Sequence, residues 1–435
     1  MMRVLWILLA YWRTRRLTFS SRAELEAFQA RKLAGFMRRL SAKSSYFAPF
    51  KDQPLTQWPG MDKAVMMANF DSMNTRGLSL KQVLNVALGA ESSRDFTPAI
   101  ADTTVGLSSG TSAQRGVFAV SARERAEWAG IMLAKALPDG LFSGERVALF
   151  LRANSNLYTT VQNRWLTFEF FDLFQPFEHN VSRLAAYRPS IIVAPAQVLR
   201  ALALAVNAGQ LQLAPKRVIS VAEVLEPQDR QVIEQAFGQL HEIYQATEGF
   251  LASTCEHGVL HLNEEYIHVE PQWLDEQQHR FVPIITDFSR WTQPIVRYRL
   301  NDVLAARQTP CPCGRATRAL DRIEGRCDDL LTLPGVDGKP VPVFPDMLSR
   351  ALAQVLPMDA DYRLIQQAPL ALTLHAEIAA DQLAAVRTHI EQALRQISVD
   401  VQRLSWTLLD QVPAFNPTIK RRRIIRAMPM EENHV

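Results

Sequence analysis

The stretch Ser108-Ser109-Gly110-Thr111-Ser112-Ala113-Gln114-Arg115-Gly116 combines small and hydroxylated residues with one cation and two glycines. This composition suits a phosphate group. Glycines let the backbone come close to an anion, hydroxyl groups donate hydrogen bonds to its oxygens, and an arginine neutralises its charge. We therefore predict a phosphate-binding loop whose contacts come from Ser108, Ser109, Gly110, Thr111, Ser112 and Arg115.

The residues after this loop predict a strand and then a helix. Val117-Phe-Ala-Val120 is typical of a strand, and Ser121-Ala-Arg-Glu124 has the pattern of a capping box at a helix start. Apolar residues at 128, 131 and 132 continue at helical spacing. The loop is therefore expected to be hairpin-like.

Two other motifs are excluded by the residues on the C-terminal side of the loop. A nucleotide-binding P-loop has G-x-x-x-x-G-K-[ST], but Gly116 is followed by Val117 and Phe118. Gly106-Leu-Ser-Ser-Gly110 matches the G-x-S-x-G of hydrolases, but that motif needs a helix directly after its serine. A plain surface loop remains the alternative on this segment alone.

The composition limits the class of protein. A chain of 435 residues with 48% hydrophobic residues is large enough for two packed domains. A net charge of +4 is too small to indicate nucleic-acid binding. Four cysteines in a chain of this length argue for a reducing compartment instead of a disulfide framework, so we expect a cytoplasmic protein.

The N-terminal segment Val4–Trp12 is apolar but short, and it runs into Arg13, Arg15 and Arg16. It is too short to span a membrane and has no cleavage site of a signal peptide behind it. Two interpretations remain. The segment is either a helix on a membrane surface, anchored by Trp6 and Trp12, or a helix packed on the main domain.

Beyond the loop, short apolar runs predict strands that are covered on both faces. These runs are Arg146–Leu151, Ser190–Ala194 and Arg217–Ala222. Ligands of parallel sheets bind at the carboxyl ends of the strands. Residues 152–158, and Ala222 with Glu223, are therefore candidates for a binding edge.

Three later segments carry further chemistry. They are Tyr244-Gln-Ala-Thr247-Glu248-Gly249, Pro294–Val303 with Asp302, and Ile323–Leu330 with Arg326 and Asp328. An aromatic ring can stack on adenine, a threonine can donate to a phosphate, and a carboxylate can hold Mg²⁺. For the first segment, a capped loop around a buried tyrosine is the structural alternative.

Together with the phosphate loop, these segments resemble, in order, the motifs of adenylate-forming enzymes. The similarity is to the short branch formed by phenylacetate-CoA ligase and coenzyme F synthetase-like proteins, and it covers most of the chain. Ala113, Gln245 and Asn301 stand where that family has glycine. The resemblance implies an α/β fold, with a large N-terminal domain of mixed and parallel sheets and a small C-terminal α+β lid.

The resemblance also implies a role for each matching residue. Tyr244 would contact the adenine, Asp302 the ribose and Arg326 the nucleotide. Thr247 would bind phosphate, and Glu248 would hold Mg²⁺. Asp328 would be the pivot between the domains. Ala222 and Glu223 are added to the nucleotide-binding set because they follow the end of a predicted parallel strand.

The C-terminal part changes in character at about Leu331. A linker rich in Gly and Pro precedes a helix near 345–355, an alternating run at 362–377, a helix at 381–397 and a strand at 399–409. We expect a core domain at residues 1–327 and a mobile lid at residues 328–435.

The end of the chain contains Lys420-Arg-Arg-Arg423, which resembles the G-K-x-x-R near the end of the family's lid, with Ile419 in place of glycine. The resemblance makes Lys420 the catalytic lysine that binds the carboxylate and the α-phosphate. A solvated basic tail is the simpler interpretation.

Cys311-Pro-Cys313-Gly-Arg315 resembles a C-x-C-G-R segment that precedes the hinge in this branch of the family. Related proteins supply two further metal ligands from a second segment, downstream of the glutamate motif. Cys255 and His261 occupy that position, and His257 is an alternative to His261. Three thiolates and one imidazole are the ligand set of a structural Zn²⁺ site. Reduced cysteines without a metal are the other interpretation.

The resemblance implies ATP-dependent adenylation of a small-molecule carboxylate, with release of pyrophosphate and transfer to a nucleophile, most readily coenzyme A. The expected cofactors are ATP, Mg²⁺, structural Zn²⁺ and coenzyme A. Expected partners include no nucleic acid and at most a peripheral membrane contact through the N-terminal helix, and a homodimer is allowed. The alternatives are an adenylyltransferase that places AMP on a small molecule and a nucleotide-binding protein without turnover.

Overall fold

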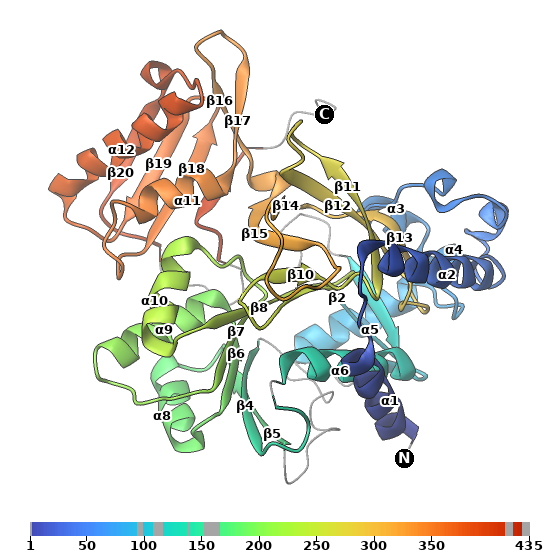
Figure 1. The fold of residues 1–435 in the computed structure, drawn as a ribbon. Coiled ribbons are helices and arrows are strands. Elements are labelled where there is room, and N and C mark those ends of the chain that lie inside the picture. Colours follow the sequence, from blue (N-terminus) through green and yellow to red (C-terminus); the bar gives the residue numbers. More distant parts are fainter. Residues whose placement is uncertain are drawn as a thin grey trace.

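The computed structural model describes residues 2–93, 99–107, 116–137, 139–151, 166–413 and 421–428. They form a large α/β domain around a twelve-stranded mixed sheet and a small domain around a four-stranded sheet (Figure 1). The expected fold class is confirmed, with the smaller sheet on the C-terminal side of the chain.

The large sheet has a parallel half and an antiparallel half. Its strands are β4 (Glu145–Leu151), β5 (Leu166–Asp172), β6 (Ile191–Ala194), β7 (Arg217–Val221), β8 (Leu240–Ala246), β9 (Gly249–Thr254), β10 (Leu260–Leu262), β11 (Ile267–Trp273), β12 (Arg280–Asp287), β13 (Ile295–Arg299), β14 (Asp302–Ala306) and β15 (Ala319–Arg326). Strands β5, β4, β6, β7 and β8 run parallel in that order. From β8 the order continues antiparallel through β9, β10, β15, β14, β12 and β11, with β13 paired to β12.

Helices cover both faces of the parallel half because its strands are apolar on both sides. On one face lie α8 (Phe177–Tyr187), α9 (Ala196–Asn207) and α10 (Pro227–Phe237), and on the other α6 (Ala122–Ala136) with α1 (Met2–Arg16) outside it. Consecutive residues of β4 point to opposite faces of the sheet. Phe150 packs in the layer of α8, α9 and α10, and Leu149 packs in the layer of α6 and α1.

The three strands that the sequence predicted here are confirmed to within one residue at each end. The edge strand β5 was missed because Thr167 and Glu169 interrupt its apolar run. An edge strand of this kind resembles a loop in sequence, since one of its sides has no neighbouring strand.

The strand and helix expected after the phosphate loop are present. β2 (Thr103–Leu107) and β3 (Val117–Ser121) pair antiparallel with Leu107 opposite Val117, and β1 (Ala99–Ile100) extends this sheet. Ser121 and Glu124 form the predicted capping box at the start of α6. The buried Glu124 carboxylate also accepts the backbone N–H of Trp291 over 2.6 Å, which fixes this end of α6.

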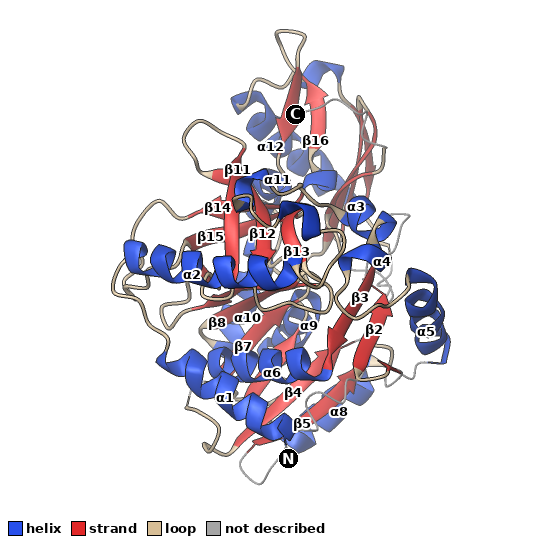
Figure 2. Ribbon diagram, turned by 90° about the vertical axis from the view of Figure 1, so that its right-hand side faces the viewer, coloured by secondary structure: helices blue, strands red, loops and turns tan. Residues whose placement is uncertain are grey.

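The N-terminal segments wrap around the large domain. They are α2 (Arg22–Ser41), α3 (Lys63–Ala68), α4 (Phe70–Met73) and α5 (Leu80–Ser93), with short 3-10 turns at Ala48–Phe50 and Leu55–Gln57. Helix α2 packs on the antiparallel half of the sheet, and α1 lies along α6 (Figure 2). None of the helices in the described ranges is long and apolar enough to cross a membrane.

The small domain has its own core between residues 331 and 424. Its elements are β16 (Leu331–Pro334), β17 (Pro340–Val343), α11 (Pro345–Ala353), β18 (Tyr362–Ala368), β19 (Ala371–Ala376), α12 (Leu383–Gln396), β20 (Ser405–Leu409) and β21 (Ile424–Arg426). The sheet order is β20-β19-β18-β21. The strand predicted at 399–409 was wrong in its first half, because Asp400 caps a 3-10 turn at Val401–Arg403.

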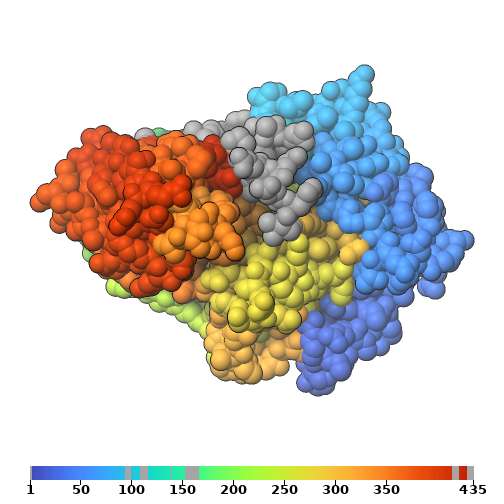
Figure 3. Space-filling model, turned by 90° about the horizontal axis from the view of Figure 1, so that it is seen from above, coloured from blue at the N-terminus to red at the C-terminus, as the bar shows by residue number. Residues whose placement is uncertain are grey.

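Polar contacts hold the small domain against α9 and α10. Figure 3 shows the small domain, orange to red, beside the yellow part of the large domain. Arg200 donates to the carbonyl of Met358 over 2.7 Å, and Gln228 donates to that of Pro357 over 2.6 Å. The buried Arg423 bridges Asp229 of α10 and Asp361 of the small domain at 2.8 and 3.2 Å.

Candidate functional site

A cavity of about 1450 Å³ lies at the carboxyl ends of the parallel strands, the edge at which the sequence predicted ligand binding. The ends of β4, β7 and β8 reach it through Leu151, Ala222 and Ala246. On the side of the small domain, Asp328 and Arg422 line it. The cavity therefore touches both domains.

Tyr244 and Asp302 are joined in this cavity. The Tyr244 hydroxyl donates to the Asp302 carboxylate over 2.5 Å. Burial and the Asp302 charge raise the pKa of Tyr244 well above its usual value, so the hydroxyl stays protonated as a donor. Asp302 lies opposite Arg326 in the register of β14 and β15. The neighbouring strands β14 and β15 and the more distant strand β8 thus bring a carboxylate, a guanidinium and a phenol to one end of the cavity.

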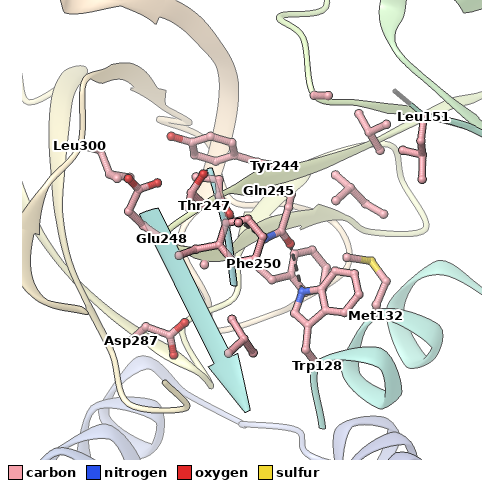
Figure 4. A pocket seen from close by; sticks show the side chains of 18 of the residues that line it. Trp128, Met132, Leu151, Tyr244, Gln245, Thr247, Glu248, Phe250, Asp287 and Leu300 are labelled. Atoms are coloured by element: carbon pink, nitrogen blue, oxygen red, sulfur yellow. Dashed lines mark hydrogen bonds between the residues drawn. The ribbon is translucent and has the colours of Figure 1, made fainter. Parts of the chain in front are cut away.

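Thr247 and Glu248 form the turn between β8 and β9 and also line the cavity. Figure 4 shows both side chains next to Tyr244. The Arg290 guanidinium donates to the Thr247 carbonyl over 3.0 Å, which holds the turn. Burial and the Glu248 carboxylate raise the pKa of Tyr298, which places these two side chains together. An acid on a fixed turn at the cavity wall can serve as an oxygen ligand for a divalent cation.

Ala222 adopts a backbone conformation that residues other than glycine rarely take, with φ of +67°. It turns the chain directly after β7, and both it and Glu223 line the cavity. Gln197 donates to the Glu223 carboxylate over 2.6 Å. Strained backbone of this kind gathers at ligand sites, which agrees with the candidate role of this pair.

Asp328 lies in a 3-10 turn at Cys327–Asp329, between the last strand of the large sheet and the small domain. The Asn301 side chain donates to the Asp328 carboxylate over 2.5 Å, and the Cys327 N–H donates to the Asn301 carbonyl over 3.0 Å. Asn301, one of the three departures from glycine, therefore ties the large domain to this junction. No local sequence pattern indicates this contact.

The part of the cavity beneath α6 is apolar, and we call it the slot. Its walls are side chains of the core between α6 and the sheet that stay partly exposed because they face the cavity: Trp128, Met132, Leu151, Phe168, Val193 and Val221. Buried residues, Val147 and Leu137 among them, line its deeper part. From Trp128 to Leu137 the slot follows α6 for roughly 13 Å, at 1.5 Å per residue.

Gln245 and Trp128 stand between the two parts of the cavity. The Trp128 indole N–H donates to the Gln245 side-chain oxygen over 3.2 Å, and the Gln245 amide donates to the Ala246 carbonyl over 2.8 Å. In Figure 4 this pair separates Tyr244, Thr247 and Glu248 from Met132 and Leu151. Gln245, the second residue that stands where the family has glycine, thus has a partner on α6. The local motif around Gln245 does not indicate this long-range contact.

Asp287 is a cavity residue that the sequence reasoning missed. It is buried at the end of β12 and accepts from the backbone N–H and the hydroxyl of Ser289 over 2.8 and 2.6 Å. Burial raises its pKa to about 6. In the sequence, a carboxylate after an apolar run indicates no more than a strand end, and only the tertiary packing shows its burial.

Cys255, His261, Cys311 and Cys313 gather in one group whose ligand atoms all lie within 4.8 Å of one another. The sulfur atoms of Cys255 and Cys311 are 3.7 Å apart, and Cys313 Sγ is 3.3 Å from His261 Nε2. His261 Nδ1 lies 3.1 Å from the Thr317 carbonyl, to which it can donate. Burial lowers the pKa of His261, which favours the neutral ring. His257 lies outside this group, which could hold a metal ion.

Several predicted site residues lie outside the described residues. They are Ser108, Ser109, Gly110, Thr111, Ser112 and Arg115 of the phosphate loop, residues 152–158, and Lys420. Their described neighbours Leu107 and Arg421 do line the cavity. Arg422 donates to Asp329 over 2.9 Å, so the chain directly after position 420 is fixed beside the junction of the domains.

No protein-family model and no curated protein matches this chain, but solved structures match its fold. 2-Hydroxyisobutyryl-CoA ligase, in the postadenylation state with 2-HIB-AMP, matches with a TM-score of 0.65 and 17% identity over 96% of this chain and 92% of its own. The same enzyme, in complex with 2-HIB-AMP and coenzyme A in the thioesterification state, matches with a TM-score of 0.50 and 17% identity over 96% of this chain and 92% of its own. GH3.15, an acyl acid amido synthetase, matches with a TM-score of 0.56 and 13% identity over 88% of this chain and 86% of its own. The chain thus has the fold of adenylate-forming ligases.

Proposed function

We propose that this protein is an ATP-dependent adenylating ligase. A carboxylate oxygen attacks the α-phosphorus of ATP, the bond to the bridging oxygen breaks, and pyrophosphate leaves. The acyl-AMP then passes its acyl group to a nucleophile, for which the thiol of coenzyme A is the first candidate. One observation carries the proposal: a single cavity joins the cluster of Tyr244, Asp302 and Arg326 to an apolar slot, in a fold that such ligases share.

At the nucleotide end, the described residues suit the parts of ATP. The Tyr244 ring would stack on the adenine, and its hydroxyl orients Asp302 to accept from the ribose hydroxyls. Arg326 would contact the nucleotide, Thr247 a phosphate, and Glu248 would hold Mg²⁺. Ala222 and Glu223 form the adjoining wall. The phosphate loop, with Thr111 and Arg115, would bind the leaving phosphates.

The substrate acid on this proposal is apolar. The walls of the slot offer aliphatic and aromatic surface, which favours an alkyl or aryl tail over a charged one. A length of roughly 13 Å along α6 admits an extended medium-length chain. Gln245 and Trp128 would lie where the carboxylate meets the nucleotide, so they would set the width at that point.

Residues 328–435 would form the lid, with Asp328 as its pivot and Lys420 as the residue that neutralises charge during adenylation. Two observations support this assignment. Arg421 and Arg422, directly after Lys420, line the cavity. The fold also matches the postadenylation state of the CoA ligase better than its thioesterification state, with TM-scores of 0.65 and 0.50.

The group of Cys255, His261, Cys311 and Cys313 would hold one structural Zn²⁺. Tetrahedral zinc with Zn–S bonds of about 2.3 Å separates two sulfur ligands by roughly 3.8 Å. The 3.7 Å between Cys255 and Cys311 fits this value. The contact from His261 Nδ1 to Thr317 would leave Nε2 for the metal. Such a thiolate site suits a reducing, cytoplasmic location.

A screen of carboxylic acids by ATP-pyrophosphate exchange, with coenzyme A consumption followed in parallel, tests this function. Straight-chain acids from four to sixteen carbons and aryl acids should include an acid that supports exchange. Exchange without coenzyme A consumption would assign another acceptor, and AMP transfer to a hydroxyl compound would favour the adenylyltransferase. ATP binding without exchange for any acid would favour the nucleotide-binding protein without turnover.

A further inference from the structure

Helix α1 has two apolar sides, and only one of them is covered. Ile7, Ala10 and Tyr11 are buried against α6. The other side, which we call the outer face, exposes Met2 (68%), Val4 (45%), Leu5 (54%), Leu8 (36%), Leu9 (59%) and Trp12 (47%). These are six of the thirteen exposed large apolar side chains within the described ranges, and the other seven are scattered. A gathered apolar surface of this kind marks a binding surface.

The packing of α1 keeps the outer face outside. A methyl group added to Gly130 of α6 would lie only 2.3 Å from the Ile7 carbonyl oxygen, so the two backbones are in contact there. Thr14 Oγ lies 2.6 Å from the Tyr266 hydroxyl oxygen, which fixes the other end of the helix. The helix therefore cannot roll to bury its outer face without giving up these contacts. Figures 1 and 2 show α1 on the outside of α6.

Positive charge borders the outer face. Arg13, Arg15 and Arg16 are exposed at the end of α1, which carries no acidic residue between Met2 and Arg16. The Arg16 guanidinium lies 5.9 Å from the ring centre of Trp12. Burial and the charges of Arg13, Arg39 and Arg31 lower the pKa of Lys32 on α2, so the cations of both helices lie close together.

We propose that the outer face of α1, with its arginines, docks the protein on an anionic lipid bilayer. Exposed leucines and a tryptophan beside arginines are the features by which helices bind in the plane of such a surface. Trp12 would be the interfacial anchor, whereas Trp6, named with it from the sequence, packs against the α6 core beside Arg123. This proposal is independent of the proposed function.

A second copy of the chain is the less suitable occupant. From Met2 to Trp12 the outer face extends for roughly 15 Å along one helix of about 10 Å diameter. A stable dimer interface covers about 800 Å² on each partner, several times this footprint.

Flotation of the purified full chain with lipid vesicles tests the proposal. The protein should float with vesicles of phosphatidylglycerol and phosphatidylcholine at low salt, and much less with phosphatidylcholine alone or in 0.5 M NaCl. A Leu5→Gln/Leu9→Gln variant should bind the anionic vesicles more weakly by on the order of tenfold or more. An Arg15→Gln/Arg16→Gln variant should lose the preference for anionic lipid. A matched Leu88→Gln/Val336→Gln variant, with exposed apolar residues away from α1, should bind as the unaltered protein does.

Two results would overturn the proposal. One is equal flotation of the unaltered protein and the Leu5→Gln/Leu9→Gln variant. The other is a dimer in solution that this variant converts to a monomer, without vesicle binding by either, which would assign the outer face to a second copy. Melting temperatures of all variants, expected within about 2 °C of the unaltered protein because the changed side chains are on the surface, exclude misfolding as the cause.

Discussion

The hydroxyl of Tyr244 donates a 2.5 Å hydrogen bond to the carboxylate of Asp302. The sequence assigned these residues to two separate motifs, one for the adenine and one for the ribose. In the structure they form one unit, placed by β8 and by the start of β14. Removing either side chain should therefore disturb the contacts of the other, and their effects on ATP binding should not be additive.

Asp302→Ala should weaken ATP·Mg²⁺ binding by on the order of tenfold to a hundredfold, since hydrogen bonds to a charged acceptor are lost. Tyr244→Phe keeps the ring and should weaken binding less. The double variant should bind with nearly the affinity of Asp302→Ala alone. Calorimetric titration of the three variants measures this, and an unchanged affinity in Asp302→Ala would remove this residue from the site.

Gln245→Gly should widen the cavity between its nucleotide end and the slot, because the side chain that meets Trp128 is lost. We expect kcat/KM to rise for branched or aryl acids relative to straight-chain acids, by several-fold, the range for about 1 kcal/mol of steric difference. Asn301→Gly is the matched control. It also restores a family glycine, but its partner is Asp328, so it should leave the preference among acids unchanged. Parallel changes in both variants would contradict a role for Gln245 in selecting the acid.

Asp287→Asn should stabilise the protein at neutral pH. Burial raises the folded-state pKa of Asp287 from 3.8 to about 6. The contribution of this carboxyl group to the free energy of unfolding is therefore most favourable below pH 4, and it is lost as the pH rises through 6. At pH 7.5 the variant should gain about 2–3 kcal/mol, at 1.36 kcal/mol per pKa unit, and the gain should shrink towards pH 4. Denaturant unfolding at both pH values measures it. Asp381→Asn, which changes an exposed carboxylate, is the control. If the stability gained by Asp287→Asn does not vary with pH, the ionisation of Asp287 is not what destabilises the folded protein.

The metal proposal predicts about one Zn²⁺ per chain in untagged protein by elemental analysis. Cys313→Ser and His261→Ala should lose the metal and several degrees of melting temperature, because the binding energy of a structural zinc is linked to folding. His257→Ala and Cys327→Ser are matched controls, since both residues lie outside the group, and they should keep the metal. Metal-free protein that melts at the same temperature as a zinc-loaded sample would leave these cysteines as ordinary core residues.

Local patterns predicted a large part of the fold. The capping box at Ser121 and the apolar runs of β4, β6 and β7 depend on neighbouring residues, and the structure has them where they were expected. Patterns failed at two other strands. The alternation of β5 conceals an edge strand, and the cap at Asp400 shortens the strand that was expected to begin at Val399.

The sequence likewise predicted one part of the candidate site and not the rest. The motifs identified Tyr244, Glu248, Asp302 and Arg326, which do line one cavity. The partners of Gln245 and Asn301 were not predictable, because each partner lies in another element and the motifs show these residues only as departures from glycine. The burial of Asp287 likewise depends on residues distant in sequence.

Acid-dependent ATP-pyrophosphate exchange, measured with the unaltered protein and with Lys420→Ala, tests whether the lid supplies a lysine for adenylation. The ammonium group should act mainly in the transition state, where negative charge accumulates between the carboxylate and the α-phosphate. We predict that Lys420→Ala keeps its affinity for ATP, loses exchange by on the order of a hundredfold or more, and still transfers acyl groups from a preformed acyl-AMP. Equal loss in both half-reactions would contradict the role of Lys420, and absence of exchange by the unaltered protein with every acid would contradict the proposed function itself.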